Sequence, residues 1–530
     1  MKTATITHKL LGVSLFAALL VLATGCNEDF LQRDPYIGSS QGNFYQTADD
    51  AEAAIKACYA PLQVEISAPG SHFRWFFGDV VSDDADKGGS GDADAADLQE
   101  FADFFGDPAS GIVLGEWQAA YKGITYCNIA LENIPGIDMD ELEKNALMAE
   151  ARFIRAFWYF NLVTTFGGVP LVTTTLAPSE YAQPRASQQE VWNQIEADLI
   201  EASTYLREKS SFSQNETGRA TSGAANALLA KAYLYQGKYA ECRERCLEVM
   251  QSGEYSLAID YGSIFTESGE NGEGSIWEIQ YANDSGGNWG AQFWSEGTYT
   301  NVFQRARGAF QGYGFNLPTQ DFVDAFRTWT EVVNGNEIPR VDPRLGYTVY
   351  TLGDTIADWG VLSEEATDMP HPYYARKYFN PASELAPFGD PNPNGGSNDR
   401  VIRFADVLLM HSESCNRLGF DDEAKESLKM VWERAGLPWK TNSIPGFDER
   451  YPDITPVWNH VGDQLLETIW RERRVELGLE GHRFFDLVRQ GRAGEVLAEA
   501  GFQTGKSELF PIPTAEITLS NGQLTQNPGY

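Results

Sequence analysis

Residues 221–250, TSGAANALLAKAYLYQGKYAECRERCLEVM, constrain the fold more than any other segment, because they encode two consecutive helices. Ala, Leu and Tyr recur at helical spacing on one side of each helix, while Lys, Arg and Glu occupy the other side. The two helices are joined at Gln236, Gly237 and Lys238. A helix pair with one apolar face needs a neighbour to cover that face, so we expect several such pairs to stack.

The order of residues in this pair resembles a tetratricopeptide repeat. The pattern A-x-x-Y-x-x-x-G-x-Y is followed by a small residue five positions after the glycine. In this alignment Cys242 takes the position where the paired helices touch, and Cys246 takes a large apolar position one turn later. Both cysteines are therefore predicted to be core residues. A metal half-site is disfavoured because no matching His/Cys pair accompanies them and the chain has only 6 histidines.

A second copy of the pattern is residues 407–436, VLLMHSESCNRLGFDDEAKESLKMVWERAG. Gly419 ends its first helix, and Ala424 follows five residues later. His411 and Cys415 fall on the packing face of that helix. His411 is therefore predicted to be a buried, hydrogen-bonded histidine and not a metal ligand.

A third helical segment, residues 143–172, is likewise rich in alanine and aromatic residues, and its helix is predicted to end at Gly167 and Gly168. Together these segments predict a mostly α fold built on a tetratricopeptide-like helical scaffold. The helical parts are expected at about residues 40–252 and 400–490.

The sequence pattern changes between about residues 253 and 399, where helical periodicity is lost and Gly, Asn, Pro and aromatic residues become frequent. Residues 275–282, SIWEIQYA, alternate like a strand, and Trp277 within them is expected in the core. No linker separates this region from its flanks. We therefore predict one domain over residues 26–530, with a loop-rich, partly β insertion that forms the ligand-binding face.

Directly after the predicted strand, residues 286–299 read GGNWGAQFWSEGTY and combine large aromatic side chains with several glycines. Large aromatic side chains are common in cores, whereas glycine-rich loops run over surfaces and carry function. The combination predicts an exposed aromatic platform.

Residues 1–25 are predicted to be a lipoprotein signal peptide. The apolar run at residues 10–23 is too short and too early to be a spanning helix of the mature protein. It ends at small residues directly before Cys26, which resembles a bacterial lipobox with this cysteine as the lipidated N-terminus. Asn27, Glu28 and Asp29 look like the surface-export signal of Bacteroidetes lipoproteins. We expect a cell-surface protein that acyl chains on Cys26 anchor in the outer membrane.

Six segments along the chain carry a more specific pattern. They are CNEDFLQRDP (26–35), AEARFIRAFWYFNLVTTFGGVPLV (149–172), YYARKY (373–378), VIRFADVLLMHSESCNRLG (401–419), WRERRVELGLEGHRFFDLVRQG (470–491) and FPIPTAEITLSNGQLTQNPGY (510–530). In this order they resemble the SusD/RagB family of nutrient-uptake outer-membrane lipoproteins of Bacteroidetes. The resemblance covers essentially the whole mature chain, although His411 and Ser412 stand where Tyr-Ala is common.

The most recognisable of these blocks contains several acid and base side chains. Glu472 and Arg473 are expected to pair with Glu476 and neighbouring arginines at helical spacing. We interpret these residues, with His482 and Asp486, as a structural charge network. No catalytic residue is predicted.

The resemblance implies a protein that binds extracellular glycans and lies as a lid on a SusC-type TonB-dependent transporter. Trp or Tyr can cover the apolar face of a sugar ring, while carboxylates or amides bind its hydroxyl groups. Within the insertion, the predicted ligand-binding residues are Trp289, Trp294, Tyr299, Tyr313 and Arg376.

A second candidate segment is residues 72–97, HFRWFFGDVVSDDADKGGSGDADAAD, where Trp75 precedes an acidic, glycine-rich loop. In the family, the matching Ser-Asp-Asp…Gly-Gly loop lies near the ligand site, which adds Trp75 and Asp83 to the candidates. A calcium loop is the alternative, but the EF-hand order fails at Gly88. No cofactor is expected.

The formal net charge of −35 repels phosphate backbones, so a nucleic-acid partner is not expected. Two alternatives to glycan delivery remain. One is the same architecture capturing oligopeptides. The other is a surface glycosidase, which needs two carboxylates roughly 5–9.5 Å apart on either side of the ligand.

Overall fold

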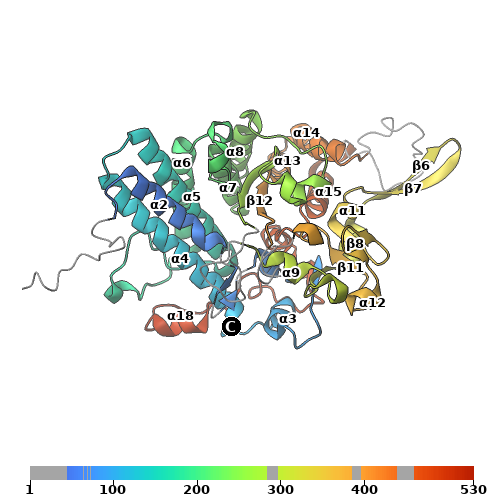
Figure 1. The fold of residues 1–530 in the computed structure, drawn as a ribbon, viewed down its shortest axis with the longest axis horizontal. Helices are drawn as coiled ribbons and strands as arrows, with labels where there is room; N and C mark the ends of the chain where they lie inside the picture. The colour runs from blue at the N-terminus through green and yellow to red at the C-terminus, as the bar shows by residue number, and fades with distance from the viewer. Residues whose placement is uncertain are drawn as a thin grey trace, which may run out of the picture.

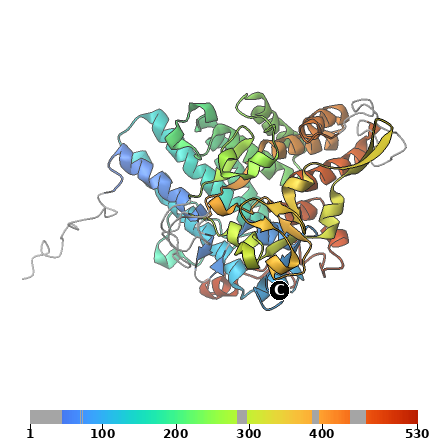
Figure 2. The same ribbon diagram turned by 45° about the vertical axis from the view of Figure 1, so that its right-hand side comes forward.

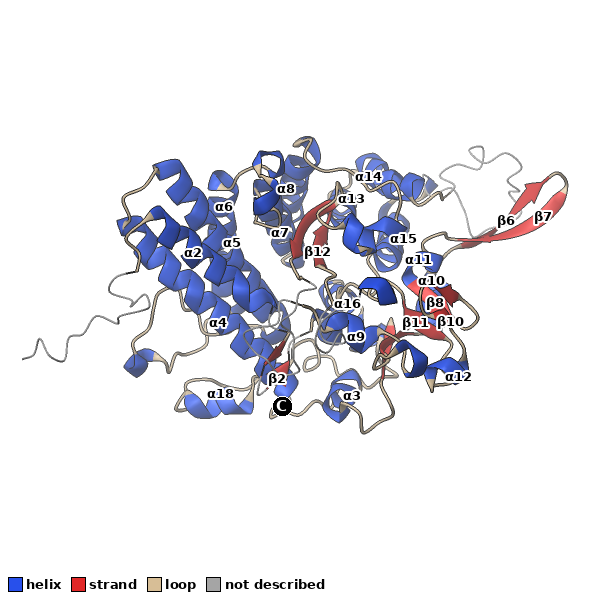
Figure 3. Ribbon diagram, viewed as in Figure 1, coloured by secondary structure: helices blue, strands red, loops and turns tan. Residues whose placement is uncertain are grey.

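The computed structural model describes residues 44–63, 65–67, 70–71, 73–282, 297–384, 395–437 and 459–530. The fold is mostly helical, as expected, and helices surround much of the molecule (Figure 3). The described helices are α2 (Ala48–Tyr59), α3 (Ala96–Ala102), α4 (Gly111–Asn133), α5 (Glu141–Phe166), α6 (Gln188–Tyr205), α7 (Ser222–Tyr235), α8 (Tyr239–Gln251), α9 (Thr300–Gln304), α10 (Gln320–Ala325), α11 (Leu345–Thr348), α12 (Glu364–Thr367), α13 (Phe404–Arg417), α14 (Asp421–Arg434), α15 (Gly462–Glu476), α16 (Arg483–Arg489), α17 (Ala493–Val496) and α18 (Thr514–Leu519).

Each described strand pairs with one antiparallel partner. The pairs are β1 (Ile66–Ser67) with β2 (Gly70–Ser71), β3 (Ala85–Gly88) with β5 (Phe315–Pro318), β4 (Ser275–Ile279) with β12 (Asp399–Arg403), β6 (Thr328–Val333) with β7 (Asn336–Val341), β8 (Val349–Thr351) with β11 (Tyr373–Ala375), and β9 (Thr355–Ile356) with β10 (Gly360–Val361).

The long helices begin and end where the sequence supplies caps. The Asp140 carboxylate accepts hydrogen bonds from the backbone N–H groups of Leu142 and Glu143 at the start of α5. The Thr221 hydroxyl does the same for Ala224 at the start of α7. These side chains replace hydrogen-bond partners that the first turn of a helix lacks. Helix α5 ends before Gly167, whose φ of +75° suits glycine.

The helices stack side by side in chain order from α4 to α8, and α13 then packs against α8 (Figure 1). The two predicted helix pairs are confirmed as α7–α8 and α13–α14. Cys242 and Cys246 are fully buried, which confirms both as core residues. His411 is also buried, and its Nδ1 lies 2.8 Å from Ser427 Oγ, so the predicted hydrogen-bonded interior position is confirmed.

The pair β4–β12 fixes how the insertion joins the scaffold. Asp399 pairs with Ile279 and Arg403 with Ser275, so the chain leaves the scaffold and returns to it at adjacent strands. Trp277 of β4 packs edge-on against Phe153 and Phe157 of α5, with ring centroids 4.7 and 4.9 Å apart. The loop-rich, partly β region is therefore attached directly to the helical core, and the prediction of Trp277 as a core residue is confirmed.

The described part of this region contains short helices and small sheets, as predicted. The β6–β7 hairpin extends away from the body in both ribbon views (Figures 1 and 2). Within the described residues, no helix combines the length and the apolar character needed to cross a bilayer.

The charge network is structural, as predicted, but its partners differ from the expected helical neighbours. Glu472 and Glu476 both pair with Arg344, at 2.5 and 2.9 Å. Arg473 pairs with Asp406 of α13 at 2.5 Å. All five side chains are buried. The expectation of pairing at helical spacing was wrong for Glu472, Arg473 and Glu476, because these side chains point into the core, where distant segments supply the opposite charges.

Replacing Gly123 with alanine tests the close packing of α4 on α5. Alanine normally favours a helix by about 1 kcal/mol over glycine. Here an added Cβ would lie 2.0 Å from Nε1 of the buried Trp158, so the helices must move apart. We expect Gly123→Ala to lower the free energy of unfolding by about 1–3 kcal/mol in urea denaturation. Gly136→Ala is the control, since nothing lies within 4 Å of its added Cβ; equal stability of the two variants would refute the packing argument.

Candidate functional site

The buried Glu65 carboxylate anchors the loop-rich face. It accepts hydrogen bonds from the hydroxyl groups of Thr298 and Thr300 at 2.8 and 2.9 Å, and from the backbone N–H of Tyr299. Thr298 also forms a β-bridge with Gly395. The described chain that follows residues 283–296 therefore meets the described chain that follows residues 385–394.

The predicted platform residues Trp289 and Trp294 lie outside the described residues, as does Cys26. The described chain on either side of 283–296 is firmly held. Tyr281 donates its backbone N–H to Asn398 Oδ1 at 2.8 Å on one side, and Glu65 holds Thr298 on the other. The described residues on both sides of 283–296 are therefore fixed by hydrogen bonds to neighbouring segments.

A cavity of about 40 Å³ lies beneath this anchor, and Glu65, Arg74, Glu116, Tyr281 and Asp399 contribute to its lining. Arg74 pairs with Asp399 at 3.0 Å. Burial raises the pKa of both Glu65 and Glu116 to about 7. A cavity of this size suits water and is far below the size of a sugar site. The cavity is therefore too small to hold a sugar ring.

A larger open pocket of about 510 Å³ lies beside the anchor, between α2, residues 215–219 and β4. Its polar lining includes Tyr59, Gln63 and Gln280, and Gln63 donates to the backbone carbonyl of Gln280 at 2.7 Å. The volume falls in the usual range for small-molecule sites. Sequence reasoning missed this pocket, because it joins three segments that are far apart in the chain and have no shared motif.

Two of the predicted site residues lie inside the core. Trp75 and Tyr299 are each 4% exposed. The Trp75 ring packs against Phe73 and Phe303, with centroid distances of 5.4 and 6.3 Å. The prediction that these two rings belong to an exposed binding platform is therefore wrong, because neither ring has a face open to a sugar. Their rings pack in the core beneath the loops.

Asp83 is held by arginines instead of facing solvent freely. Both of its carboxylate oxygens accept hydrogen bonds from Arg483, at 2.7 and 2.8 Å, and it also pairs with Arg474 at 2.9 Å. Arg474 binds Asp84 as well, at 2.6 Å. These carboxylates of the acidic loop already have cationic partners, and they fix the loop to α15 and α16.

Tyr313 and Arg376 remain at the surface. Tyr313 is 37% exposed, and its ring lies 5.6 Å from that of Phe303 beside α9. The half-buried Arg376 places its guanidinium over the rings of Tyr350 and Tyr347, at 4.8 and 5.3 Å. Both positions suit contact with a ligand, and their role in binding stays a prediction.

The ionisation of Glu65 gives a testable pH dependence. Its pKa rises from 4.5 when unfolded to about 7 when folded, so the folded state retains a proton that the unfolded state releases. The stability that protonated Glu65 contributes to the folded state is fully present below pH 4.5 and is lost as the pH rises through about 7. We expect the stability advantage of the wild type over Glu65→Gln to shrink by about 1–3 kcal/mol between pH 4.5 and 8. Chemical denaturation at several pH values measures it, and a gap that stays constant or widens would contradict the assignment.

Comparison with known proteins extends over nearly the whole chain. The model of the SusD family matches residues 273–530, and a model described as "Starch-binding associating with outer membrane" matches residues 79–234. SusD-like protein P2 of Formosa agariphila is 26% identical over 535 residues, covering 97% of this chain and 99% of that protein.

Solved structures agree with these matches. A laminarin-binding SusD-like protein is 30% identical, with a TM-score of 0.75, over 92% of this chain and 100% of its own. Surface glycan-binding protein A from Bacteroides fluxus is 25% identical at the same TM-score and coverage. A relative at 30% identity that is covered over its full length shows the family: the chain belongs to the SusD/RagB family.

Proposed function

We propose that this protein binds extracellular oligosaccharides or polysaccharides at its loop-rich face and passes them to a SusC-like TonB-dependent outer-membrane transporter. The observation that carries the proposal is the similarity to a laminarin-binding protein over that protein's full length, at 30% identity. Laminarin is therefore the first ligand to test.

The proposed contacts combine ring stacking with hydrogen bonding. Trp289 and Trp294 stack on sugar rings, while Tyr313 and Arg376 contact the same ligand from the neighbouring surface. Covering about 100 Å² of apolar surface contributes roughly 2.5 kcal/mol before ordering costs. Two such contacts give affinities of about millimolar to micromolar, which allow release to a transporter. Trp75, Asp83 and Tyr299 act in this proposal as supports beneath the binding face.

Calorimetric titration of residues 27–530 tests the proposal against its alternatives. The panel contains laminarin, laminarin oligosaccharides, other polysaccharides and oligopeptides. We expect saturable binding of at least one glycan and none of the peptides. Binding of peptides alone would favour the oligopeptide alternative, and release of sugar products from a bound glycan would favour a glycosidase.

Attachment to the outer membrane is proposed to depend on acylation of Cys26. Several acyl chains, each contributing about 0.8 kcal/mol per buried methylene, hold a protein stably on a membrane. We expect Cys26→Ala to move the protein from the membrane fraction to the soluble fraction after cell lysis. An equal amount of the variant in the membrane fraction would contradict this anchor.

A further inference from the structure

The open pocket of about 510 Å³ that lies against α2 is a second place where this chain has room for a small molecule. Its first wall is formed from residues 52–63 of α2 and the turn after it, its second from residues 215–219, and its third from β4 and Gln280. We refer to it as the α2 pocket. Tyr313 and Arg376, the described residues of the proposed glycan site, do not line it.

Ion pairs and hydrogen bonds hold the second wall of the α2 pocket in place. Arg219 donates to the Glu52 carboxylate of α2 at 3.0 and 3.1 Å, and to Glu150 of α5 at 2.6 Å. The Tyr59 hydroxyl donates to Glu150 at 2.7 Å and accepts from the backbone N–H of Ala220 at 2.8 Å. The pocket is therefore formed without a ligand, as is usual for small-molecule sites.

The rim of the α2 pocket offers polar groups that have no partner. The exposed side chains of Lys56, Asn215 and Thr217 make no hydrogen bond or ion pair within the described residues. They supply an ammonium, an amide and a hydroxyl group. Gln63 adds a carbonyl oxygen, since its amide N–H already donates to the backbone of Gln280. Donors and acceptors of this kind bind the hydroxyl groups of a sugar.

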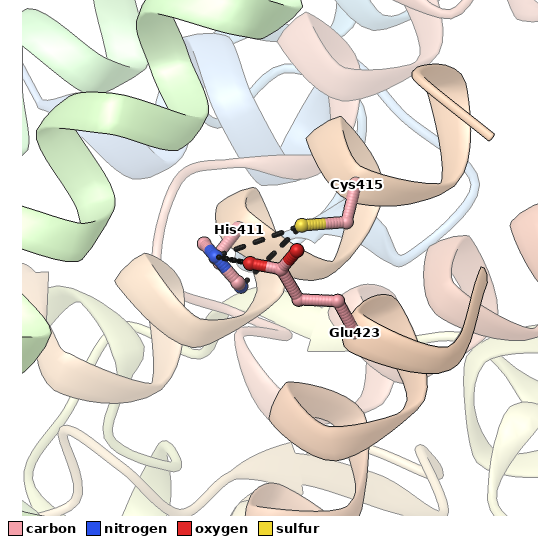
Figure 4. Close-up of side chains that lie close together, drawn as sticks. All are labelled: His411, Cys415 and Glu423. Carbon is pink, nitrogen blue, oxygen red and sulfur yellow. Dashed lines mark hydrogen bonds and ion pairs between the residues drawn. The ribbon is translucent and has the colours of Figure 1, made fainter. Parts of the chain in front are cut away.

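The polar cluster between α13 and α14 differs in this respect (Figure 4). There Arg243 contacts both oxygens of Glu423 at 2.6 and 2.8 Å, and His411 Nε2 lies 3.2 Å from the same carboxylate. Its charged groups are paired with one another, whereas the rim of the α2 pocket has groups left for a ligand.

The charges in the lining favour an uncharged ligand. Each carboxylate of the lining already has a partner at 3.0 Å or closer: Glu52 with Arg219, Glu216 with Arg207 and Glu278 with Asn398. The pocket therefore lacks a carboxylate to pair with the ammonium group of a peptide. A dianion such as phosphate would find Lys56 as a counter-charge but would also lie among three carboxylates.

We propose that the α2 pocket is a second carbohydrate site, which holds the end of a neutral oligosaccharide through Lys56, Asn215 and Thr217. The aliphatic side chains of Ile55 and Leu62 line its interior, where they can face the C–H groups of a sugar ring. The choice of carbohydrate as the ligand class rests on the proposed function. The site itself is separate from Trp289 and Trp294.

Binding in the α2 pocket is expected to be weaker than at the loop-rich face. Trp277 also lines the pocket, but its indole is 3% exposed and packs against α5, so it has no face for a sugar to stack on. Hydrogen bonds to sugar hydroxyls replace hydrogen bonds to water and contribute little each. We therefore expect a dissociation constant of about millimolar or above.

Saturation-transfer NMR with a laminarin trisaccharide tests this site in residues 27–530. The starting protein is the variant Trp289→Ala plus Trp294→Ala, which lacks the proposed stacking residues. We expect saturation transfer to the trisaccharide to persist in this variant. If the wild type shows transfer and this variant shows none, the proposed function stands and the second site is overturned. Absence of transfer in both would overturn the second site together with laminarin as the ligand.

Substitutions at the rim locate the remaining binding. Adding Lys56→Met and Asn215→Leu, both at exposed positions, is expected to weaken it about tenfold or more. Gln214→Leu is the matched control, because Gln214 is an exposed amide in the same turn and does not line the pocket. An affinity that stays unchanged in the rim variant, or that falls equally in Gln214→Leu, would overturn the assignment.

Discussion

Replacing Glu476 with glutamine is expected to lower the free energy of unfolding by about 3–5 kcal/mol, because it leaves buried cations without their counter-charge. The Glu476 carboxylate is completely buried. It lies 2.5 Å from Arg434, 2.9 Å from Arg344 and 3.1 Å from Arg403. These arginines come from the end of α14, the insertion and the end of β12. One carboxylate thus joins the scaffold to the region that carries the proposed binding face.

Glu476 also makes the free energy of unfolding depend on pH, with a sign opposite to the effect of Glu65. Burial alone would raise the pKa of Glu476, but Arg434, Arg403 and Arg344 hold it well below its usual range. The stability it supplies is present above pH 4.5, the ordinary pKa of the group, and is lost as the pH falls further. The difference in free energy of unfolding between the wild type and Glu476→Gln is therefore expected to become smaller as the pH falls below 4.5.

Urea denaturation at pH 7 and at pH 3.5 measures both effects. Glu467→Gln is the matched control, since Glu467 lies on the same helix with a side chain 59% exposed and 3.6 Å from Arg492. An exposed pair of this kind contributes about 0–1 kcal/mol. Loss of less than about 1 kcal/mol in Glu476→Gln at pH 7 would show that the surrounding charges rearrange and that this carboxylate does not hold the regions together.

Replacing Trp289 and Trp294 together with alanine is expected to weaken glycan binding by about 100-fold or more. Each indole ring that covers a sugar face contributes roughly 2.5 kcal/mol before ordering costs, and a loss of 2.8 kcal/mol is already about 100-fold. The effect should appear in the dissociation constant while the melting temperature of the free protein changes little.

Calorimetry with the best glycan of the panel provides the measurement. The control is a double substitution of Tyr181 and Tyr205, which are exposed aromatic residues near the two ends of the α6 segment. We expect that control to bind like the wild type. Binding by Trp289→Ala plus Trp294→Ala within about threefold of the wild type would remove these residues from the proposed site.

Local patterns predicted the helical scaffold well. The pairs α7–α8 and α13–α14, the strand β4 and the burial of Cys242 and Cys246 all follow from residue spacing within one element. Such features depend on neighbours a few residues away. A single sequence therefore contains enough information to place them.

Contacts between distant segments could not be predicted in the same way. Trp75 and Tyr299 looked suitable for an exposed platform, but their rings fill the core under the loops. Glu65 carries no motif, and its importance comes from hydroxyl groups more than 230 residues later in the chain.

Hydrogen–deuterium exchange with and without a saturating laminarin oligosaccharide locates the ligand on the folded protein. We expect slower exchange at the described loop-rich face, in residues 297–316 around Thr298 and Tyr313, with unchanged exchange in α6, α7 and α8. Protection confined to those helices, or no protection anywhere while the oligosaccharide is bound, would contradict a glycan site on this face.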